Sequence, residues 1–291
     1  MPSANQFSLP DGRLMSYELS PKSDEYSPTV LLSNSLCASF TTWDHVVPVL
    51  HNRGFRVLRY DQPGHGSSSP PANPESTTFE SIADDVYSLL SNLGITSLYA
   101  WIGVSMGAAT GIVFVTRNPG VVKNLVICDT ISCAPVVAGV ENLFAPRVEI
   151  ARREGNLDSI VEQTLARWFA EPWMEVNSAE TERMRAAMRK TSVEGFAACC
   201  NALTLTSFDL RALTPKVGSS VDRAMLVVGE RDANLPQSMA ELRDQIRQGF
   251  VSAGKEGVNV ELKIIKGAGH VPYVDGFDQF CEIVTEFLQE I

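Results

Sequence analysis

The segment LYAWIGVSMGAATG, residues 98–111, decides how we interpret the fold of this 291-residue chain. An apolar run typical of a strand leads into GVSMG (103–107), and small residues typical of a helix follow. In this context a Gly-x-Ser-x-Gly motif predicts a sharp strand-to-helix turn that holds the serine in a strained backbone conformation. The motif also occurs by chance in glycine-rich turns, but the flanking patterns favour a turn that exposes Ser105 as a nucleophile.

Short apolar runs alternate with helical patterns along most of the chain. The runs are rich in Val, Ile and Leu, as strands buried on both faces of a parallel sheet are. They lie at 29–35, 55–61, 97–105, 124–129, 223–230 and 260–267. The helical patterns lie at 79–93, 108–116, 237–249 and 277–288. This alternation predicts an α/β fold with a mostly parallel central sheet flanked by helices.

One long stretch between two predicted strands has no convincing strand pattern. It contains amphipathic helical segments at 141–154, 157–169, 179–190 and 193–205. We therefore expect a core built from residues 1–134 and 216–291. Residues 135–215 are expected to be inserted as a helical lid (cap) over the mouth of the site.

A serine hydroxyl is a weak nucleophile and needs a general base, most often a histidine. The chain has four histidines, and His270 alone lies C-terminal to Ser105. In serine enzymes with this strand-turn-helix motif the order along the chain is Ser, acid, His. We therefore expect His270 to be the base. His65, in the turn DQPGHG, is expected to be structural, with Asp61 capping turn amides.

The base needs a carboxylate that orients it. Asp129 and Asp232 both follow predicted strands downstream of Ser105. Asp232 has the better context, because it lies on the loop after the penultimate strand and precedes His270. We predict Asp232 as the acid and keep Asp129 as the alternative.

Acyl transfer also needs an oxyanion hole, a pair of N–H donors for the charge that develops on the carbonyl oxygen. One donor is expected to be the Met106 amide, directly after the nucleophile. The other is expected in the loop SNSLCA after the first long strand, at the Leu36 amide or the Cys37 amide.

Composition narrows the classes of partner. The formal net charge of −10 disfavours nucleic acid, because an acidic surface repels phosphate backbones. The longest apolar stretches are far shorter than the roughly 20 residues of a membrane span. The N-terminal segment MPSANQFSLPDG shows no secretory signal, and the six cysteines have no metal-type spacing. We expect a soluble, cytoplasmic protein with neither a cofactor nor a metal ion.

Taken together, these residues resemble the 3-oxoadipate enol-lactonase family of α/β-hydrolases over nearly the whole chain. The run NSL (34–36) resembles that family's oxyanion segment, and the turn around His65 is similar to its turn after the next strand. The lid discriminates better, because lids diverge between hydrolase families. Here the segments REG (153–155), TLARWF (164–169) and VEGFAACC (193–200) look like that family's lid.

The resemblance implies an α/β-hydrolase fold and hydrolysis of a small lactone through an acyl-enzyme. By resemblance, Ser105, Asp232 and His270 take the roles of a catalytic triad, and Trp168 faces the substrate. Cys37 departs from the family, which usually has Gly there, so this residue is expected to alter which substrate fits. The family substrate is an anion, which implies a cation or several hydrogen-bond donors in the pocket. The candidate cations are the lid arginines Arg147, Arg167 and Arg185.

Three other functions use the same fold. The first is an esterase or lactonase acting on a different, secondary-metabolite substrate. The second is other chemistry on the same core, such as cofactor-free haloperoxidation or C–C bond hydrolysis, since fold does not determine function. The third is a non-catalytic ligand-binding protein, against which an intact Ser-Asp-His set argues.

Overall fold

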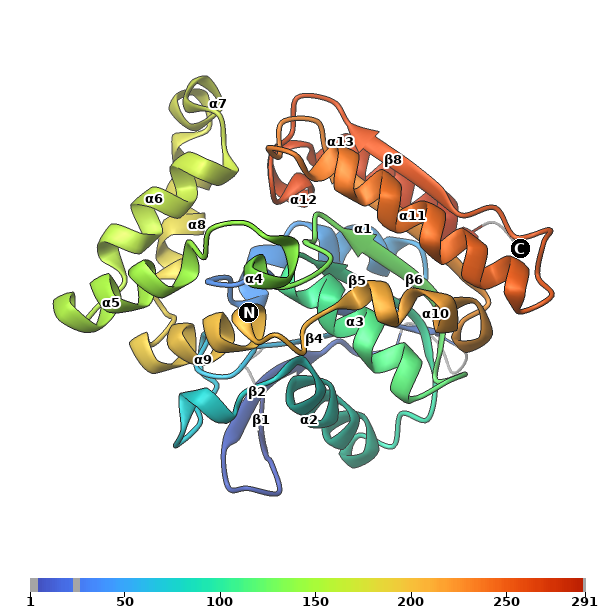
Figure 1. Cartoon of the computed structure of the whole chain (residues 1–291), viewed down its shortest axis with the longest axis horizontal. Coiled ribbons are helices and arrows are strands. Elements are labelled where there is room, and N and C mark those ends of the chain that lie inside the picture. The colour runs from blue at the N-terminus through green and yellow to red at the C-terminus, as the bar shows by residue number, and fades with distance from the viewer. Residues whose placement is uncertain (1–4, 23–26, 290–291) are drawn as a thin grey trace.

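The computed structural model describes residues 5–22 and 27–289, and one eight-stranded sheet forms its centre (Figure 1). The strand order is β1-β2-β4-β3-β5-β6-β7-β8. The last six strands of the chain run parallel, and β1 and β2 form an antiparallel hairpin at one edge. The strands are β1 (Asn5–Ser8), β2 (Leu14–Leu19), β3 (Thr29–Ser33), β4 (Arg56–Tyr60), β5 (Leu98–Val104), β6 (Val122–Cys128), β7 (Arg223–Gly229) and β8 (Glu261–Ile265).

All six predicted strands are present, and the predicted α/β class is confirmed. The pattern missed β1 and β2, because a hairpin at a sheet edge keeps one face in solvent and lacks a continuous apolar run. The segment for which we predicted no secretory signal includes residues 1–4, which lie outside the described residues. Within the described part of the chain, no helix is both long and apolar enough to cross a membrane.

Helices cover both faces of the sheet. The β3-to-β4 connection steps along the sheet in the opposite direction to the later connections, so right-handed crossovers put its helix on the opposite face. Accordingly α1 packs with α13, whereas α2, α3, α10 and α11 contact one another in series. These helices are α1 (Val46–Asn52), α2 (Phe79–Asn92), α3 (Met106–Arg117), α10 (Thr214–Ser220), α11 (Leu235–Ser252) and α13 (Phe277–Gln289); the short α12 spans Pro272–Asp275.

Between β6 and β7 the chain leaves the sheet and forms a group of helices, of which α5 to α8 stand beside the core in Figure 1. The ends of this segment are held together: Cys133 and Asp209 form an antiparallel bridge, and Leu210 N–H donates to Ser132 O at 2.8 Å. Residues 135–215 contain no strand, as predicted; a lid function stays a prediction. The helices are α4 (Pro135–Ala138), α5 (Phe144–Glu154), α6 (Asp158–Trp168), α7 (Glu171–Val176), α8 (Ser178–Met188) and α9 (Val193–Thr204).

The first of the predicted helices in this segment begins later than its amphipathic pattern indicated. The pattern put the start at residue 141, but α5 begins at Phe144. The Asn142 side chain accepts hydrogen bonds from the N–H groups of Phe144 and Ala145, at 3.0 and 3.3 Å. A side-chain acceptor at this place satisfies first-turn N–H groups that have no partner within the helix.

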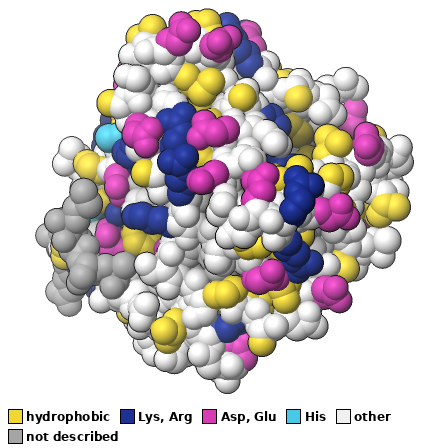
Figure 2. All heavy atoms as spheres, turned by 90° about the vertical axis from the view of Figure 1, so that its left-hand side faces the viewer, with side chains coloured by type: hydrophobic (Ala, Val, Ile, Leu, Met, Phe, Trp, Pro, Cys, Tyr) yellow, Lys and Arg dark blue, Asp and Glu magenta, His cyan; other side chains and the backbone are white. Residues whose placement is uncertain are grey.

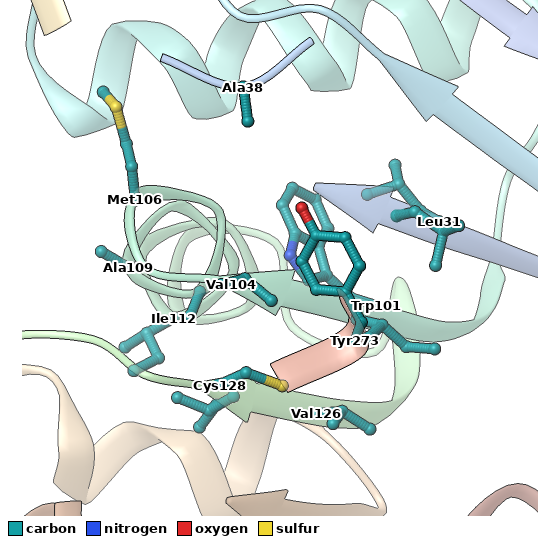
Figure 3. Close-up of a cluster of buried hydrophobic side chains, with 14 of the residues drawn as sticks. Leu31, Ala38, Trp101, Val104, Met106, Ala109, Ile112, Val126, Cys128 and Tyr273 are labelled. Carbon is teal, nitrogen blue, oxygen red and sulfur yellow. The ribbon is translucent and has the colours of Figure 1, made fainter. Parts of the chain in front are cut away.

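The apolar core lies between the sheet and its helices, and it extends to the turn at Ser105 (Figure 3). Trp101 of β5 is fully buried, and its Nε1 donates to the carbonyl oxygen of Gly107 at 3.0 Å. Gly111 of α3 packs directly on the same indole ring. The core therefore holds the start of α3 against β5.

Candidate active site

The turn between β5 and α3 has the strained geometry that the motif predicted. Ser105 has φ of 55° and ψ of −116°, and it is half-buried. A Cβ on Gly103 would collide with the carbonyl of Gly107, and a Cβ on Gly107 would collide with the carbonyl of Ser33. Both glycines are therefore required for β5 and α3 to approach each other and β3.

The sheet brings four chemistry-bearing residues to one edge. Residues at the carboxyl ends of β5 to β8 are paired in register, from Val104 with Cys128 to Gly229 with Ile265. The loops that follow these ends carry Ser105, Asp129, Asp232 and His270. Parallel strands present their carboxyl ends at a common edge, which is where α/β proteins bind ligands.

His270 and Asp232 are joined by a short hydrogen bond. The distance from His270 Nδ1 to Asp232 Oδ2 is 2.6 Å, and both side chains are buried. Burial opposes ionisation of Asp232, but the adjacent His270 outweighs it, so the pKa of Asp232 lies below its usual value. An ionised Asp232 holds the Nδ1 proton on the imidazole and leaves Nε2 as the basic nitrogen.

Ser105 and His270 do not form a hydrogen bond with each other in the part of the chain that the structure describes. Catalytic hydrogen bonds are often long without substrate and tighten in the complex. The pairing of Ser105 with His270 therefore stays a prediction, whereas the contact of His270 with Asp232 is an observed feature.

The loop after β3 separates the two alternatives for the second oxyanion donor. Cys37 N–H donates to His65 Nε2 at 3.0 Å, so this amide is already used. The amides of Leu36 and Met106 make no hydrogen bond to any described residue. The geometry therefore favours the Leu36 and Met106 amides as the pair of donors.

His65 has a structural role, as expected, but the sequence did not indicate its partner, the Cys37 amide. Its Nδ1 lies 3.0 Å from the carbonyl oxygen of Pro63, and complete burial lowers the pKa of His65 to about 4. The ring is therefore neutral at pH 7, donating through Nδ1 and accepting from Cys37 through Nε2. Cys37 itself has φ of 66°, a conformation that usually favours glycine. The only sequence signal for this contact was the position of His65 between two glycines.

Trp168, at the end of α6, packs against the imidazole of His270. The ring centroids lie 5.5 Å apart, and the Trp168 carbonyl accepts the His270 N–H at 3.3 Å. The indole is 1% exposed, and its Nε1 has no hydrogen-bond partner among the described residues. A buried N–H without a partner is costly, and no described residue offsets this cost.

Two of the three lid arginines lie near the oxyanion loop. Both Arg147 and Arg167 act electrostatically on Cys37. Arg147 also donates to the Thr164 hydroxyl and lies over the Phe196 ring.

Arg167 has no hydrogen bond or ion pair to any described residue. Its side chain keeps solvent-accessible surface, yet burial lowers its pKa, and Arg147 lowers that pKa further. By its accessible surface Arg167 is an exposed residue, so its guanidinium is within reach of a molecule that enters from solvent.

Arg185, the third candidate, is held in surface ion pairs, so the structure does not support it as the pocket cation. It pairs with Glu162 at 2.7 Å and with Glu182 at 2.6 Å. Arginine and lysine side chains lie among acidic ones on the face shown in Figure 2. The helical pattern identified α8 but not which of its sides faces the core.

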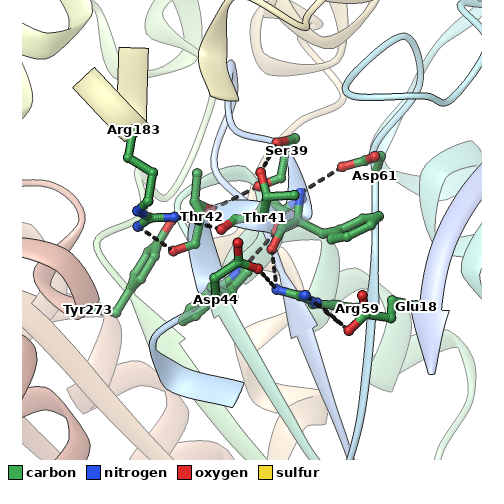
Figure 4. A network of polar contacts seen from close by, with 12 residues as sticks. Glu18, Ser39, Thr41, Thr42, Asp44, Arg59, Asp61, Arg183 and Tyr273 are labelled. Atoms are coloured by element: carbon green, nitrogen blue, oxygen red, sulfur yellow. Dashed lines mark hydrogen bonds and ion pairs between the residues drawn. The ribbon is translucent and has the colours of Figure 1, made fainter. Parts of the chain in front are cut away.

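A polar network connects α8 to the segment that follows the oxyanion loop (Figure 4). Arg183 donates to the carbonyl oxygens of Thr41 and Thr42, at 2.7 and 3.2 Å. In the same network Asp61 accepts from Phe40 N–H at 2.7 Å, in agreement with its predicted capping role. The helices inserted after β6 are therefore hydrogen-bonded to the backbone next to the oxyanion loop.

Among the described residues, no three His, Cys, Asp or Glu side chains are arranged so that they could hold a metal ion. The titratable groups that gather at the sheet edge are the carboxyl groups and the imidazole described above. Such a set is suited to proton transfer and to nucleophilic attack by a serine.

Comparison with known proteins adds the family. Residues 28–277 match the family described as the alpha/beta hydrolase fold. The chain belongs to this family. Its relatives include 3-oxoadipate enol-lactonase 2 of Acinetobacter baylyi, which is 27% identical over 205 residues, covering 70% of this chain and 72% of the relative. A putative carbamate hydrolase of Stutzerimonas stutzeri is 26% identical over 282 residues, covering 95% of this chain and 97% of the relative.

Among solved structures, the enol-lactonase from Burkholderia xenovorans is similar to this α/β hydrolase with a TM-score of 0.83 and 28% identity. The match covers 98% of this chain and all of the other. The resemblance to enol-lactonases is thus confirmed at the level of fold and family, and the chain is a hydrolase of the alpha/beta family.

Proposed function

We propose that this hydrolase opens a small anionic lactone of the enol-lactone type, with Ser105 as nucleophile, His270 as base and Asp232 as the acid that orients it. The observation that carries the proposal is the Asp232–His270 hydrogen bond at the same sheet edge as the strained Ser105 turn. The enol-lactonase relatives support the choice of substrate class.

In the first half of the reaction, Ser105 Oγ attacks the lactone carbonyl carbon while His270 Nε2 takes the hydroxyl proton. The carbonyl oxygen becomes an oxyanion that accepts hydrogen bonds from the Leu36 and Met106 amides. The carbon–oxygen bond of the ring then breaks and leaves an acyl-enzyme. An enolate leaves more readily than an alkoxide; it takes up the proton from His270 and tautomerises to the ketone.

In the second half, water attacks the acyl-enzyme carbonyl and His270 Nε2 takes a proton from it. Collapse of the second tetrahedral intermediate breaks the bond to Ser105 Oγ, which recovers its proton from His270. Asp232 stays ionised throughout and stabilises the imidazolium that forms in each half.

Arg167 supports an anionic substrate. A guanidinium near Cys37 and Asp232, without a hydrogen bond or ion pair to a described residue, is suited to a carboxylate that enters with the substrate. Trp168, whose ring packs against His270, supplies a second N–H donor without a described partner. We propose that these two groups bind the substrate carboxylate. Cys37, whose amide is bound to His65, is proposed to shape the pocket with its side chain.

The test is a turnover assay of purified protein on 3-oxoadipate enol-lactone, neutral lactones, short-chain esters and carbamates, with Ser105→Ala as the blank. Turnover of the enol-lactone is expected, with kcat lowered by roughly 10⁴-fold or more in Ser105→Ala. A fluorophosphonate probe should label the wild-type protein at Ser105 and leave the variant unlabelled. Turnover that survives Ser105→Ala would contradict the mechanism.

The same screen separates the alternatives. Turnover of neutral esters, lactones or carbamates without turnover of the enol-lactone would favour an esterase for another substrate. A folded protein that neither reacts with the probe nor turns over any substrate would favour a ligand-binding protein. A cytoplasmic location is also proposed, supported by six unpaired cysteines.

The role of Arg167 has its own prediction. Arg167→Met should raise KM for the enol-lactone by about 10- to 100-fold, the range expected for losing a charged hydrogen bond. Neutral esters should keep their KM. The matched control is Arg185→Met, which removes a surface arginine and should change neither value. An equal rise of KM for charged and neutral substrates would show that Arg167 does not recognise the anion.

A further inference from the structure

Asp129 is a buried acid next to the proposed triad that the mechanism above does not use. It directly follows β6, it is fully buried, and its N–H donates to Val227 O of β7 at 3.1 Å. Its φ of 44° lies in the left-handed region, which Asp and Asn tolerate better than most residues. The carboxyl group of Asp129 therefore lies beneath the loop after β7, which carries Asp232.

The two oxygens of this carboxyl group have different surroundings. Asp129 Oδ1 accepts the N–H of Gly229 at 2.8 Å, whereas Oδ2 is buried and receives no hydrogen bond from any described residue. The loop that carries Asp232 meets Asp129 at the same residue, because Asp232 N–H donates to Gly229 O at 3.2 Å, and the charge of Asp232 acts on the Asp129 carboxyl group. Two carboxyl groups form a hydrogen bond only if one of them carries a proton.

The surroundings decide which of the two carries the proton. Burial raises the pKa of Asp129 well above its usual value, and the charge of Asp232 raises it further. The pKa of Asp232 lies below its usual value, because His270 and Arg167 outweigh its burial. The titratable groups that face the pair are His270, Arg167 of α6, Asp275 of α12 and Cys128 of β6.

We propose that Asp129 is a positioning residue that keeps its proton and donates it in a hydrogen bond to Asp232. The bond orients Asp232 so that Oδ2 receives the Nδ1 proton of His270. Because Asp129 is neutral, it adds no second negative charge beside the imidazole. The effect on catalysis rests on the proposed function, whereas the protonation of Asp129 does not.

The first experiment reads the proton directly. Infrared spectra of wild type and Asp129→Asn are compared at about pH 9, above the pKa values of about 7 of the buried Asp61 and Asp275. Asn is the matched variant, because its amide can accept from Gly229 and donate to Asp232. The difference spectrum should contain the carbonyl band of a protonated carboxylic acid. Absence of this band overturns the proposal.

A second measurement keeps the test independent of the variant's folding. Carbon-13 NMR of wild type labelled at the aspartate carboxyl carbons should show one group that stays protonated at about pH 9. A spectrum in which every described aspartate is ionised at that pH overturns the proposal. Both measurements give a result even if the protein turns over no ester or lactone. Absence of turnover would contradict the proposed function but not the protonation of Asp129.

The functional part is tested by comparing Asp129→Asn with Asp129→Ala. Asn should keep kcat within about threefold and leave the acid limb of the kcat/KM profile in place, because one neutral donor replaces another. Ala should lower kcat by about tenfold or more at unchanged KM, since Asp232 loses its hydrogen bond. Collapse of kcat in Asp129→Asn, or an acid limb moved by about one unit, shows a charged Asp129 and overturns the proposal. Full kcat per folded molecule in Asp129→Ala also overturns it.

Discussion

His65 shows how one neutral side chain can hold a catalytic loop in shape. Its Nε2 uses the Cys37 amide and thereby leaves the Leu36 amide as the free donor. Because burial lowers the pKa of His65 to about 4, the folded protein resists protonating it, while the unfolded chain protonates near 6.5. The stability from this depressed pKa is present above about pH 6.5 and is lost as the pH falls towards 4.

His65→Leu should therefore have a pH-dependent cost. The variant lacks the ring that titrates, so the difference in unfolding free energy between wild type and variant should shrink by about 2 kcal/mol between pH 7 and pH 4.5. Urea unfolding of both proteins at the two pH values measures this. A difference that stays constant would mean that His65 is accessible to protons in the folded state.

Residue patterns predicted which residues gather at the sheet edge better than which partners they contact. The motif around Ser105 and the positions of Asp232 and His270 after strands are local features, and chain order alone relates them. The contact of His65 with Cys37 joins two loops, and the contact of Asp129 with Gly229 joins the ends of two strands. Such contacts depend on how the helices, strands and loops pack against one another. The spacing of residues along the sequence does not specify this packing.

At the scale of the element, α9 approaches the core so closely that the residues at the contact must be glycines. A Cβ on Gly195 would collide with the backbone of Gly64, in the turn after β4, and a Cβ on Gly64 would collide with Gly195 in return. Ser192, the N-cap of α9, accepts from Gly195 N–H and donates to Gly64 O at 3.0 Å. These contacts bring the helix against the turn that contains His65.

Gly195→Ala tests this approach. In a solvent-exposed helix the change stabilises by about 1 kcal/mol, so any loss of stability reports the clash. We expect a net loss of about 1–3 kcal/mol in denaturant unfolding, the usual range for overpacking. The control is Gly257→Ala, where an added Cβ meets no atom within 4 Å. Equal stability of the two variants would show that α9 can shift without cost.

The packing of the helices also explains why the amphipathic pattern did not show where individual arginine side chains lie. Amphipathic spacing located α5, α6, α8 and α9, but it did not show that Arg185 pairs with two glutamates whereas Arg167 has no described partner and lies near Cys37. Both residues sit among polar positions, and a long cationic side chain is compatible with either location. The neighbouring helices decide between them.

At the scale of the whole molecule, Arg183 is the main polar tie between α8 and the loop beside the oxyanion hole. Arg183→Met removes two hydrogen bonds to backbone carbonyls of residues 41 and 42. Hydrogen exchange of α8 amides should accelerate by about 10-fold or more, while the amides of β5 and β6 keep their protection. Arg189→Met, which removes an exposed partner of Asp158, is the control. Unchanged exchange in α8 would mean that apolar packing alone holds the helix.

The backbone hydrogen bonds between residues 132–134 and 208–210 have a consequence for how the sequence of such a protein can change in evolution. The two ends of the intervening segment lie side by side whatever folds between them, and lengthening a closed loop adds little entropic cost. Replacement, growth or shrinkage of these helices therefore leaves the pairing of β6 with β7 in place. Related proteins can therefore differ in the helices between β6 and β7, and in the substrates they prefer, while the residues at the sheet edge stay in the same arrangement.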